Sequence, residues 1–421
     1  MGIATVTAAR IARNQERGDD QDRPFFFETF PFTAISKTSS LDKHTTDSAA
    51  GAMALMAGWK VTSPSISPPV PRWSSRLWVE SLGLAVGLAT TDTVTGATPA
   101  ALYAKDVHRS MEATLLPKEK GGNRTDGRDI TQEWASISPT RRLLTDKSSL
   151  LGHSSAGADQ LLGLFSLGTL PYAIDEASQR VPRLADLAEK AVRQLQTGDK
   201  GYFLMVEGAL IDKAEHHNEF RVAARELSEF DEAIERVAAL VGEDTLIIVT
   251  ADHAHALTLP GYLDRKQSIF ERDTHDSNVT SIFFATGPGY GGGNRTNYTA
   301  EESRAPHFAQ PAAFYMKNGA HGGEDVGVWA MGPYAWLFSG TMENTQVAYN
   351  TKFLLCLQED SICDRKWRVD REEEWPSVPL QAKVAMGVLG SMAFLLSLLS
   401  LFLISSLIRR PCRKDSISIS P

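Results

Sequence analysis

The chain has 421 residues, of which 42% are hydrophobic and 22% are charged, so it can bury a substantial core in one large or two ordinary globular domains. Its formal net charge of −8, with no basic stripe to offset it, argues against a protein that binds nucleic acid. Three cysteines are too few for a disulfide scaffold.

The first 60 residues are predicted to be structured. A helix is expected to begin within residues 8–12, and a second covers residues 48–59, where alanine and methionine favour helix. Residues 61–76 are rich in proline and serine, which predicts a loop or an insert. Residues 82–91 are predicted to form a buried strand, and the polar, glycine-rich residues 116–128 a loop.

The middle of the chain alternates predicted helices and strands. Residues 184–194 have the pattern of an amphipathic helix, and residues 222–241 place apolar side chains at helical spacings. The apolar runs 202–206, 245–250 and 280–286 are predicted to be strands. Strand, helix and strand in this order predict a βαβ unit with a right-handed crossover. The glycine- and asparagine-rich segment that follows, residues 287–320, is predicted to be a surface excursion.

Acidic and histidine side chains follow two of these strands. Asp252 and His253 come directly after one buried strand, and Glu207 ends another. Asp212 and His216 are four positions apart, which puts both on one face of a helix, where they can share a metal ion. Because ligands bind at the carboxyl ends of strands in open α/β sheets, these residues predict a hydrolytic site with several metal ions.

Most of these residues also have a simpler explanation when each is taken alone. Asp212 and His216 fit an exposed acidic helix start, and Glu207 fits a capping carboxylate. His321, in the glycine-flanked string AHGGEDVG, fits a solvent-exposed side chain. Asp252 and His253 are more specific, because polar groups do not end a buried strand without a partner.

Ser48 begins the alanine-rich helix directly after Asp47. A serine at this position is most often only a helix cap. Beside a zinc ion its hydroxyl could instead become a nucleophile, and free N–H groups at the helix start would favour a phosphate. Arg109 is a candidate for a bidentate clamp on phosphate oxygens, although taken alone it fits a surface arginine.

Residues 384–408 are 25 uncharged, mostly apolar residues, which is long enough to cross a membrane core of about 30 Å. Four basic residues follow within residues 409–414, so residues 409–421 are predicted to be a cytoplasmic tail and the N-terminal part to be extracellular. Residues 361–383 are then a stalk. The alternatives are a buried core helix and a cleaved lipid-anchor signal, and the polar tail favours a true span.

Four sequons, at Asn123, Asn278, Asn294 and Asn297, fit an extracellular face. The first 15 residues contain no apolar run of a secretory signal, so the N-terminus given is expected to be incomplete.

Several strings together resemble the alkaline phosphatases of animals and bacteria, in the family's order: TTDSAAGAMALMAGWK, FLMVEGALIDKAEHH, TLIIVTADHAH and AHGGEDVGVWAMGP. Three further strings, MGIATVTAARI, FPFTAISKTSSLDKH and TDGRDITQEW, resemble the animal branch. The resemblance spans most of residues 1–360, with an unmatched insert at about 61–80 and a gap at about 111–123. It implies an α/β fold in which a mostly parallel central sheet has helices on both faces and lacks its N-terminal strand.

The resemblance also implies functions for single residues. Ser48 would become phosphoserine, and Asp47 would orient Arg109 on the phosphate. One zinc ion would be bound by Asp212, His216 and His321, and a second by Asp252 and His253. Glu207 and Thr98 would serve a magnesium site.

Phosphate monoesters are the implied substrates, a homodimer is the implied assembly, and Cys356 and Cys363 match a short-range disulfide of the animal proteins.

The chain departs from the family in several places. The family opens with a strand ending in D-G-M-G, whose Asp bridges a zinc and the magnesium, and this chain begins inside that motif at Met1. Gly96 stands where the magnesium site usually has Asp or His. Lys213 resembles the bacterial variant and would temper the charge of that site. These departures predict impaired activity and favour one alternative, an inactive membrane-anchored zinc-binding ectodomain, although the remaining ligand residues are intact. A sulfatase or phosphodiesterase of the same superfamily is a second alternative, and the string DSA around Ser48 argues against it.

Overall fold

The computed structural model describes most residues of the unit that runs from Met1 to Ser361. The described residues are 1–66, 83–103, 107–108, 141–155, 160–272, 280–292 and 298–357. Several predictions fall outside them: Arg109, the four sequons, the side chains of Cys356 and Cys363, and the span 384–408. Within the described ranges, no helix is both long enough and apolar enough to span a bilayer.

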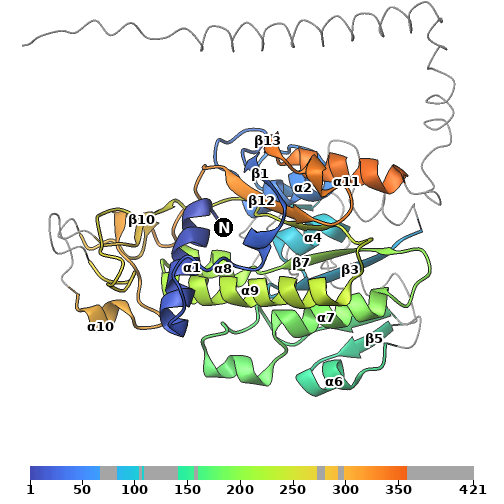
Figure 1. Ribbon diagram of the computed structural model, residues 1–421, viewed down its shortest axis with the longest axis horizontal. Helices are drawn as coiled ribbons and strands as arrows, with labels where there is room; N and C mark the ends of the chain where they lie inside the picture. The colour runs from blue at the N-terminus through green and yellow to red at the C-terminus, as the bar shows by residue number, and fades with distance from the viewer. Residues whose placement is uncertain are drawn as a thin grey trace, which may run out of the picture. The chain divides into compact units, whose positions relative to one another are not determined.

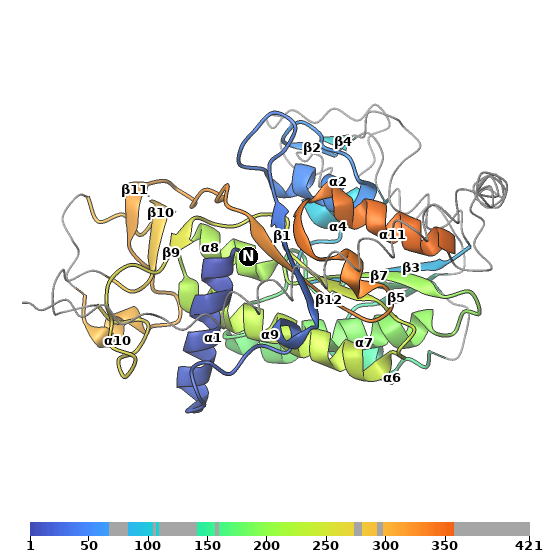
Figure 2. The same ribbon diagram turned by 45° about the horizontal axis from the view of Figure 1, so that its top comes forward.

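Helices cover both sides of the strands, as predicted (Figures 1 and 2). On one side of the strands β3 (Ala85–Thr90) and β7 (Tyr202–Glu207) lie α7 and α9, and on the other lie α2, α4 and α11. The α-helices are α1 (Ile3–Arg17), α2 (Ser48–Ala57), α4 (Ala97–Tyr103), α6 (Lys147–Gly152), α7 (Leu184–Leu195), α8 (Leu210–His216), α9 (Phe220–Leu240), α10 (Ala300–Ser303) and α11 (Thr345–Leu357). Short 3₁₀ helices are η1 (Phe27–Thr29), η4 (Glu176–Arg180) and η5 (Ala335–Leu337).

The described strands form one four-stranded sheet and several smaller ones. The four-stranded sheet has the order β13-β1-β12-β8, and β3 pairs in parallel with β7. A three-stranded sheet has the order β11-β10-β9. The strands are β1 (Phe32–Lys37), β2 (Ser65–Ile66), β3 (Ala85–Thr90), β4 (Val107–His108), β5 (Arg141–Leu144), β6 (Gln160–Gly163), β7 (Tyr202–Glu207), β8 (Ile247–Val249), β9 (Leu257–Thr258), β10 (Phe283–Gly287), β11 (Ala312–Tyr315), β12 (Val326–Met331) and β13 (Gly340–Glu343).

The predicted βαβ unit of β7, α9 and β8 needs a correction. β7 is hydrogen-bonded to β3, whereas β8 is hydrogen-bonded in the antiparallel sense to β12. Among the described strands none joins β7 to β8, and their described partners lie in different sheets. Local apolar patterning identifies a strand, but only tertiary pairing selects its neighbour.

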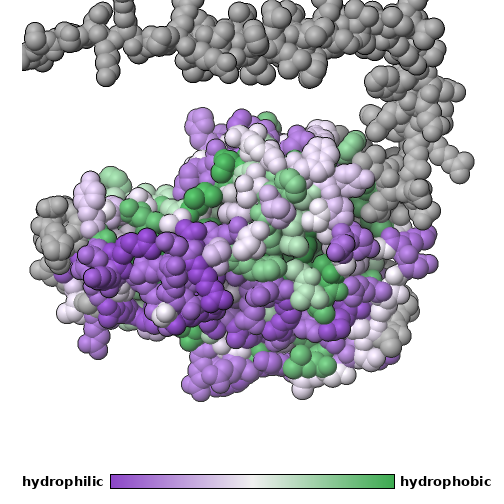
Figure 3. Space-filling model, viewed as in Figure 1, coloured by the Kyte–Doolittle hydropathy of each residue, from purple (hydrophilic) through white to green (hydrophobic). Residues whose placement is uncertain are grey.

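The main core lies between α1, α9 and the strands that they cover. Phe25, Phe27 and Phe220 are fully buried there, and Trp329 of β12 meets the ring of Phe27 edge-on at 4.9 Å between centroids. The outer surface of α1 and α9 is mostly hydrophilic in the view of Figure 3, as expected for helices that bury one stripe. This core holds β8, β12 and α8 in place, and the polar residues that follow or line these elements form the site described next.

Candidate metal centre

The structure brings together the acidic and histidine residues that the sequence singled out. Asp212 and His216 lie on α8, His253 follows β8, and His321 lies in the loop between β11 and β12. His253 Nε2 is 3.9 Å from Asp212 Oδ1, and His321 Nε2 is 3.6 Å from the same oxygen. Segments more than 100 positions apart in the chain therefore meet at one carboxylate.

Ser48 lies at the edge of this cluster. Its Oγ is 3.1 Å from His253 Nε2, so the hydroxyl and the imidazoles share one site. Asp47, and not Ser48, is the helix cap, because its carboxylate accepts hydrogen bonds from the backbone N–H groups of Ala49 and Ala50. The expectation that these N–H groups are free for phosphate is therefore wrong for Ala49 and Ala50.

Four side chains have ligand atoms within 4.8 Å of one another: Asp212, His216, His255 and His321. One carboxylate with several imidazoles is a donor set that suits zinc. His255 was missed by the sequence argument, although it stands two residues after His253 in the string TADHAH. The spacing H-x-H after a buried strand was the available signal.

Backbone carbonyls orient two of these imidazoles. His216 donates from Nδ1 to the carbonyl oxygen of Gly319 at 2.6 Å, and His321 donates from Nδ1 to that of Thr46 at 2.9 Å. With the proton on Nδ1, each ring has its lone pair on Nε2. These two Nε2 atoms are only 3.3 Å apart, and two lone pairs cannot bond to each other. A cation bound by both nitrogens would resolve this contact, so the residues fit a metal ion.

His255 differs from its neighbours. Its Nε2 is 2.5 Å from Asp212 Oδ1, so this nitrogen donates to the carboxylate, and its Nδ1 is buried without a hydrogen-bond partner. The ring of His255 is completely buried and meets that of His216 edge-on at 4.5 Å. His255 therefore positions Asp212.

Burial controls the charge of the cluster. It lowers the pKa of His216 to about 4 and that of His253 to about 3, and it lowers the pKa of His321. Burial would raise the pKa of Asp212, but the hydrogen bond from His255 and the charges of the histidines hold that pKa well below its usual value. At neutral pH the site therefore presents neutral imidazoles and an ionised carboxylate, which are the forms that bind metal ions.

The predicted second zinc site has both of its residues beside Ser48. Asp252 Oδ2 lies 3.3 Å from His253 Nε2, and the His253 ring stacks on that of His321 at 3.5 Å between centroids. Gly51 allows α2 to lie close to the segment that follows β8, because a Cβ on Gly51 would lie only 3.0 Å from Cβ of Asp252. The glycine one turn after Ser48 thus allows the Ser48 hydroxyl to lie close to Asp252 and His253.

Glu207 and Thr98, predicted for magnesium, are also neighbours. Thr98 and Thr90 both hydrogen-bond the carboxylate of Glu207, the latter at 2.5 Å. Burial, followed by the nearby charge of Asp92, raises the pKa of Glu207 to about 7.

Arg109 lies outside the described residues. His217, beside His216 in the sequence, is exposed and is not part of the cluster.

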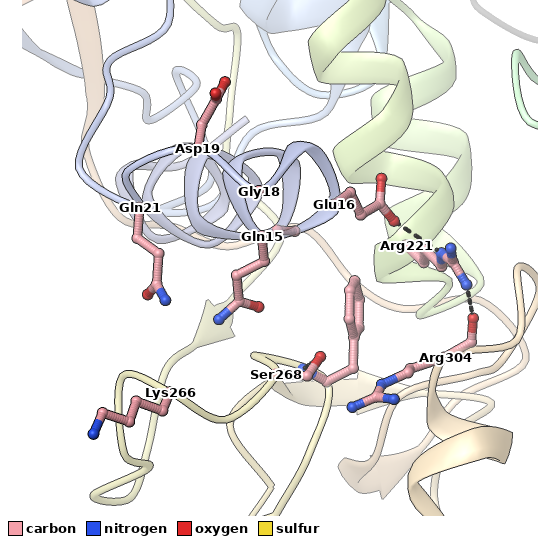
Figure 4. A pocket seen from close by; sticks show the side chains of 11 residues that line it. Gln15, Glu16, Gly18, Asp19, Gln21, Arg221, Lys266, Ser268 and Arg304 are labelled. Carbon is pink, nitrogen blue, oxygen red and sulfur yellow. Dashed lines mark hydrogen bonds and ion pairs between the residues drawn. The ribbon is translucent and has the colours of Figure 1, made fainter.

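A separate cavity of about 490 Å³ lies at the end of α1 (Figure 4). Its wall has charges of both signs, and Arg221 lines one side of it, where it hydrogen-bonds Glu16 and the backbone carbonyl of Arg304. It contains neither a histidine nor Ser48, so the candidate chemistry lies elsewhere.

Comparisons with known proteins identify one family. The family model described as "Alkaline phosphatase" matches residues 1–120 and 110–357. The tissue-nonspecific alkaline phosphatase of Felis catus is 30% identical over 85% of this chain and 82% of its own length. A cold-active alkaline phosphatase from Shewanella sp. superposes with a TM-score of 0.62 at 24% identity, covering 84% of this chain and 97% of the other. A TAB5 alkaline phosphatase mutant "with Mg bound in the M3 site" gives a TM-score of 0.57 at 23% identity, covering 82% and 93%.

Proposed function

This chain belongs to the alkaline phosphatase family and is a hydrolase of phosphate monoesters, and we propose that it works through a phosphoserine formed at Ser48. The observation that carries the proposal is the 3.1 Å contact between Ser48 Oγ and His253 Nε2 at the edge of the acid and histidine cluster. A serine hydroxyl is a weak nucleophile by itself, and a metal-type cluster beside it supplies the activation that it needs.

The chain's own residues would act in two steps. Ser48 Oγ attacks phosphorus, the bond to the alcohol breaks, and the alcohol leaves with a proton. Water then attacks phosphorus, the bond to Ser48 Oγ breaks, and inorganic phosphate leaves while the serine regains its proton. Arg109 is proposed to hold phosphate oxygens, with Asp47 orienting it.

Two zinc sites are proposed from the donor sets: Asp212, His216 and His321 in one, Asp252 and His253 in the other. Glu207 and Thr98 are proposed for magnesium, and a relative of the same fold is described with Mg in its M3 site. When bound, such ions supply Lewis acidity that makes coordinated oxygens more acidic and offsets the charge of a transferring phosphoryl group. His255 keeps Asp212 ionised and oriented for this purpose.

Activity towards an aryl phosphate at alkaline pH tests the proposal directly. The full chain with zinc and magnesium should release phosphate, a chelator should abolish release, and Ser48→Ala should lower it at least about a thousandfold. Ser228→Ala is a matched control, because Ser228 on α9 bonds only its own helix at Ala224 and should leave activity unchanged.

Trapping with radiolabelled phosphate should label the wild type and not Ser48→Ala. Zinc uptake without any phosphate release would support the non-catalytic alternative and refute the proposal. A comparison of monoester, diester and sulfate ester substrates separates the remaining superfamily alternative.

The location and assembly are further proposals. Residues 384–408 are proposed to anchor the protein in the plasma membrane, with the catalytic unit outside and residues 409–421 in the cytoplasm. Detergent, but not a phosphatidylinositol-cleaving phospholipase, should then release activity from cells, and release by the phospholipase would indicate a lipid anchor. The homodimer proposed from the family is tested by light scattering.

A further inference from the structure

Gly96 leaves space beside the proposed magnesium site, and a neighbouring carboxylate fills it. A Cβ atom built on Gly96 would lie 2.5 Å from Oδ2 of Asp92 and 2.9 Å from its Cγ, which is closer than such atoms approach. The Asp92 carboxylate therefore lies where a side chain at position 96 would begin. The backbone of Gly96 is not left-handed, so its conformation does not itself require glycine.

The pairing of β3 with β7 places Asp92 next to Glu207. Thr90, the last residue of β3, is paired with Glu207, and Asp92 follows two residues later. The Thr90 hydroxyl donates to Glu207 and accepts a hydrogen bond from the backbone N–H of Asp92 at 2.9 Å. Thr98, in the first turn of α4, hydrogen-bonds the same Glu207 carboxylate. Two carboxylates and a threonine hydroxyl thus lie at one end of the β3–β7 pair.

A cation is already associated with this group. Lys213 Nζ lies 3.7 Å from Asp92 Oδ2, and the lysine side chain is about one-third exposed, at 32%, whereas that of Asp92 is 13% exposed. Two neighbouring carboxylates in a mostly buried setting repel each other, so a positive charge stabilises them. The lysine extends from α8, and its side chain is partly exposed to solvent.

We propose that Asp92 replaces the side chain that position 96 lacks, so that Asp92, Glu207 and Thr98 bind Mg²⁺ and the Lys213 ammonium is the cation that Mg²⁺ displaces. Magnesium prefers oxygen ligands and keeps several of its waters, so three protein oxygens are a sufficient set. The inference rests on the proposed function for the adjacent metal centre, but it assigns a residue that the family pattern does not place there.

Calorimetric titration of the zinc-loaded full chain with MgCl₂ tests this assignment without reference to activity. The wild type should bind one Mg²⁺, and Asp92→Asn should weaken that binding about 10- to 100-fold with unchanged zinc content. Asparagine keeps an oxygen that can accept from the N–H of Thr93, so the loop should stay intact. Asp199→Asn, an equal charge change on an exposed turn, is the matched control.

A carboxylate relocated to position 96 gives a second test. In Asp92→Ala/Gly96→Asp the new side chain has the space that Asp92 vacates, and Mg²⁺ affinity should return to within about tenfold of wild type. Wild-type protein that takes up no Mg²⁺, or Asp92→Asn with undiminished affinity, would overturn the inference. Phosphate release that depends on zinc and Ser48 would in either case leave the proposed function standing, so the two failures are distinguishable.

Discussion

His255 allows the sharpest test of how the metal centre is held. The perturbation is His255→Leu. Leucine fills the completely buried position with an apolar side chain of moderate size, but it cannot donate a hydrogen bond to Asp212. The other imidazoles cannot take over this contact where they stand, because His321 and His253 are 3.6 Å and 3.9 Å from the same oxygen. Asp212 would lose its short hydrogen bond and some of the stabilisation of its charge.

The magnitude follows from the kind of bond that is lost. A hydrogen bond to a charged group contributes about 1.5–3 kcal/mol. Removal of a partner that orients a metal ligand typically weakens metal binding about 10- to 100-fold, which corresponds to about 1.4–2.7 kcal/mol. The two ranges agree, so we expect zinc affinity at the Asp212 site to fall by one to two orders of magnitude.

Competition with a chromophoric chelator measures this loss as a dissociation constant. His217→Leu is the matched control, because His217 is exposed beside His216 and should leave the constant unchanged. Unaltered zinc affinity in His255→Leu, with the control also unaltered, would refute the reasoning that His255 positions Asp212.

Three further predictions concern stability. The metal-free protein should lose stability as the pH falls below about 6.5, because unfolded histidines take up protons there, whereas His216 and His253 in the folded protein have pKa values of about 4 and about 3 and stay neutral. A urea midpoint that is the same at about pH 8 and about pH 5 would contradict this. Phe27→Ala should lower the free energy of unfolding, measured by urea denaturation, by about 3–5 kcal/mol, because it leaves a cavity at a fully buried position, whereas Phe314→Ala at an exposed position should change it little. Equal losses in the two variants would show that Phe27 does not lie in the core. His307 donates hydrogen bonds to two carboxylates, which raise its pKa, so its contribution to the stability of the folded protein is complete below about pH 6.5 and is lost as the pH rises through the raised pKa. The difference in urea midpoint between wild type and His307→Gln should therefore shrink towards alkaline pH, and a pH-independent difference would exclude the charged interaction.

Sequence patterning was sufficient for much of the fold and for the type of site. The helical spacing of residues 222–241 corresponds to α9 (Phe220–Leu240), and the apolar run 202–206 corresponds to β7 (Tyr202–Glu207). Such patterns are readable because burial on one face selects residues at the period of the element itself. Polar residues after apolar strands likewise indicated a metal-type site, because a charge there needs a partner.

Only the tertiary structure decided which strands pair and which side chains meet. β7 and β8 both follow the strand pattern, yet among the described strands β7 pairs with β3 and β8 with β12, because pairing depends on contacts between distant segments. The sequence did not distinguish His255 as the donor that orients Asp212, and it showed Gly96 only as a missing ligand. That Asp92 fills the space at position 96 follows from the parallel register of β3 and β7, since side-chain direction and distance are properties of the folded backbone and not of spacing along the chain.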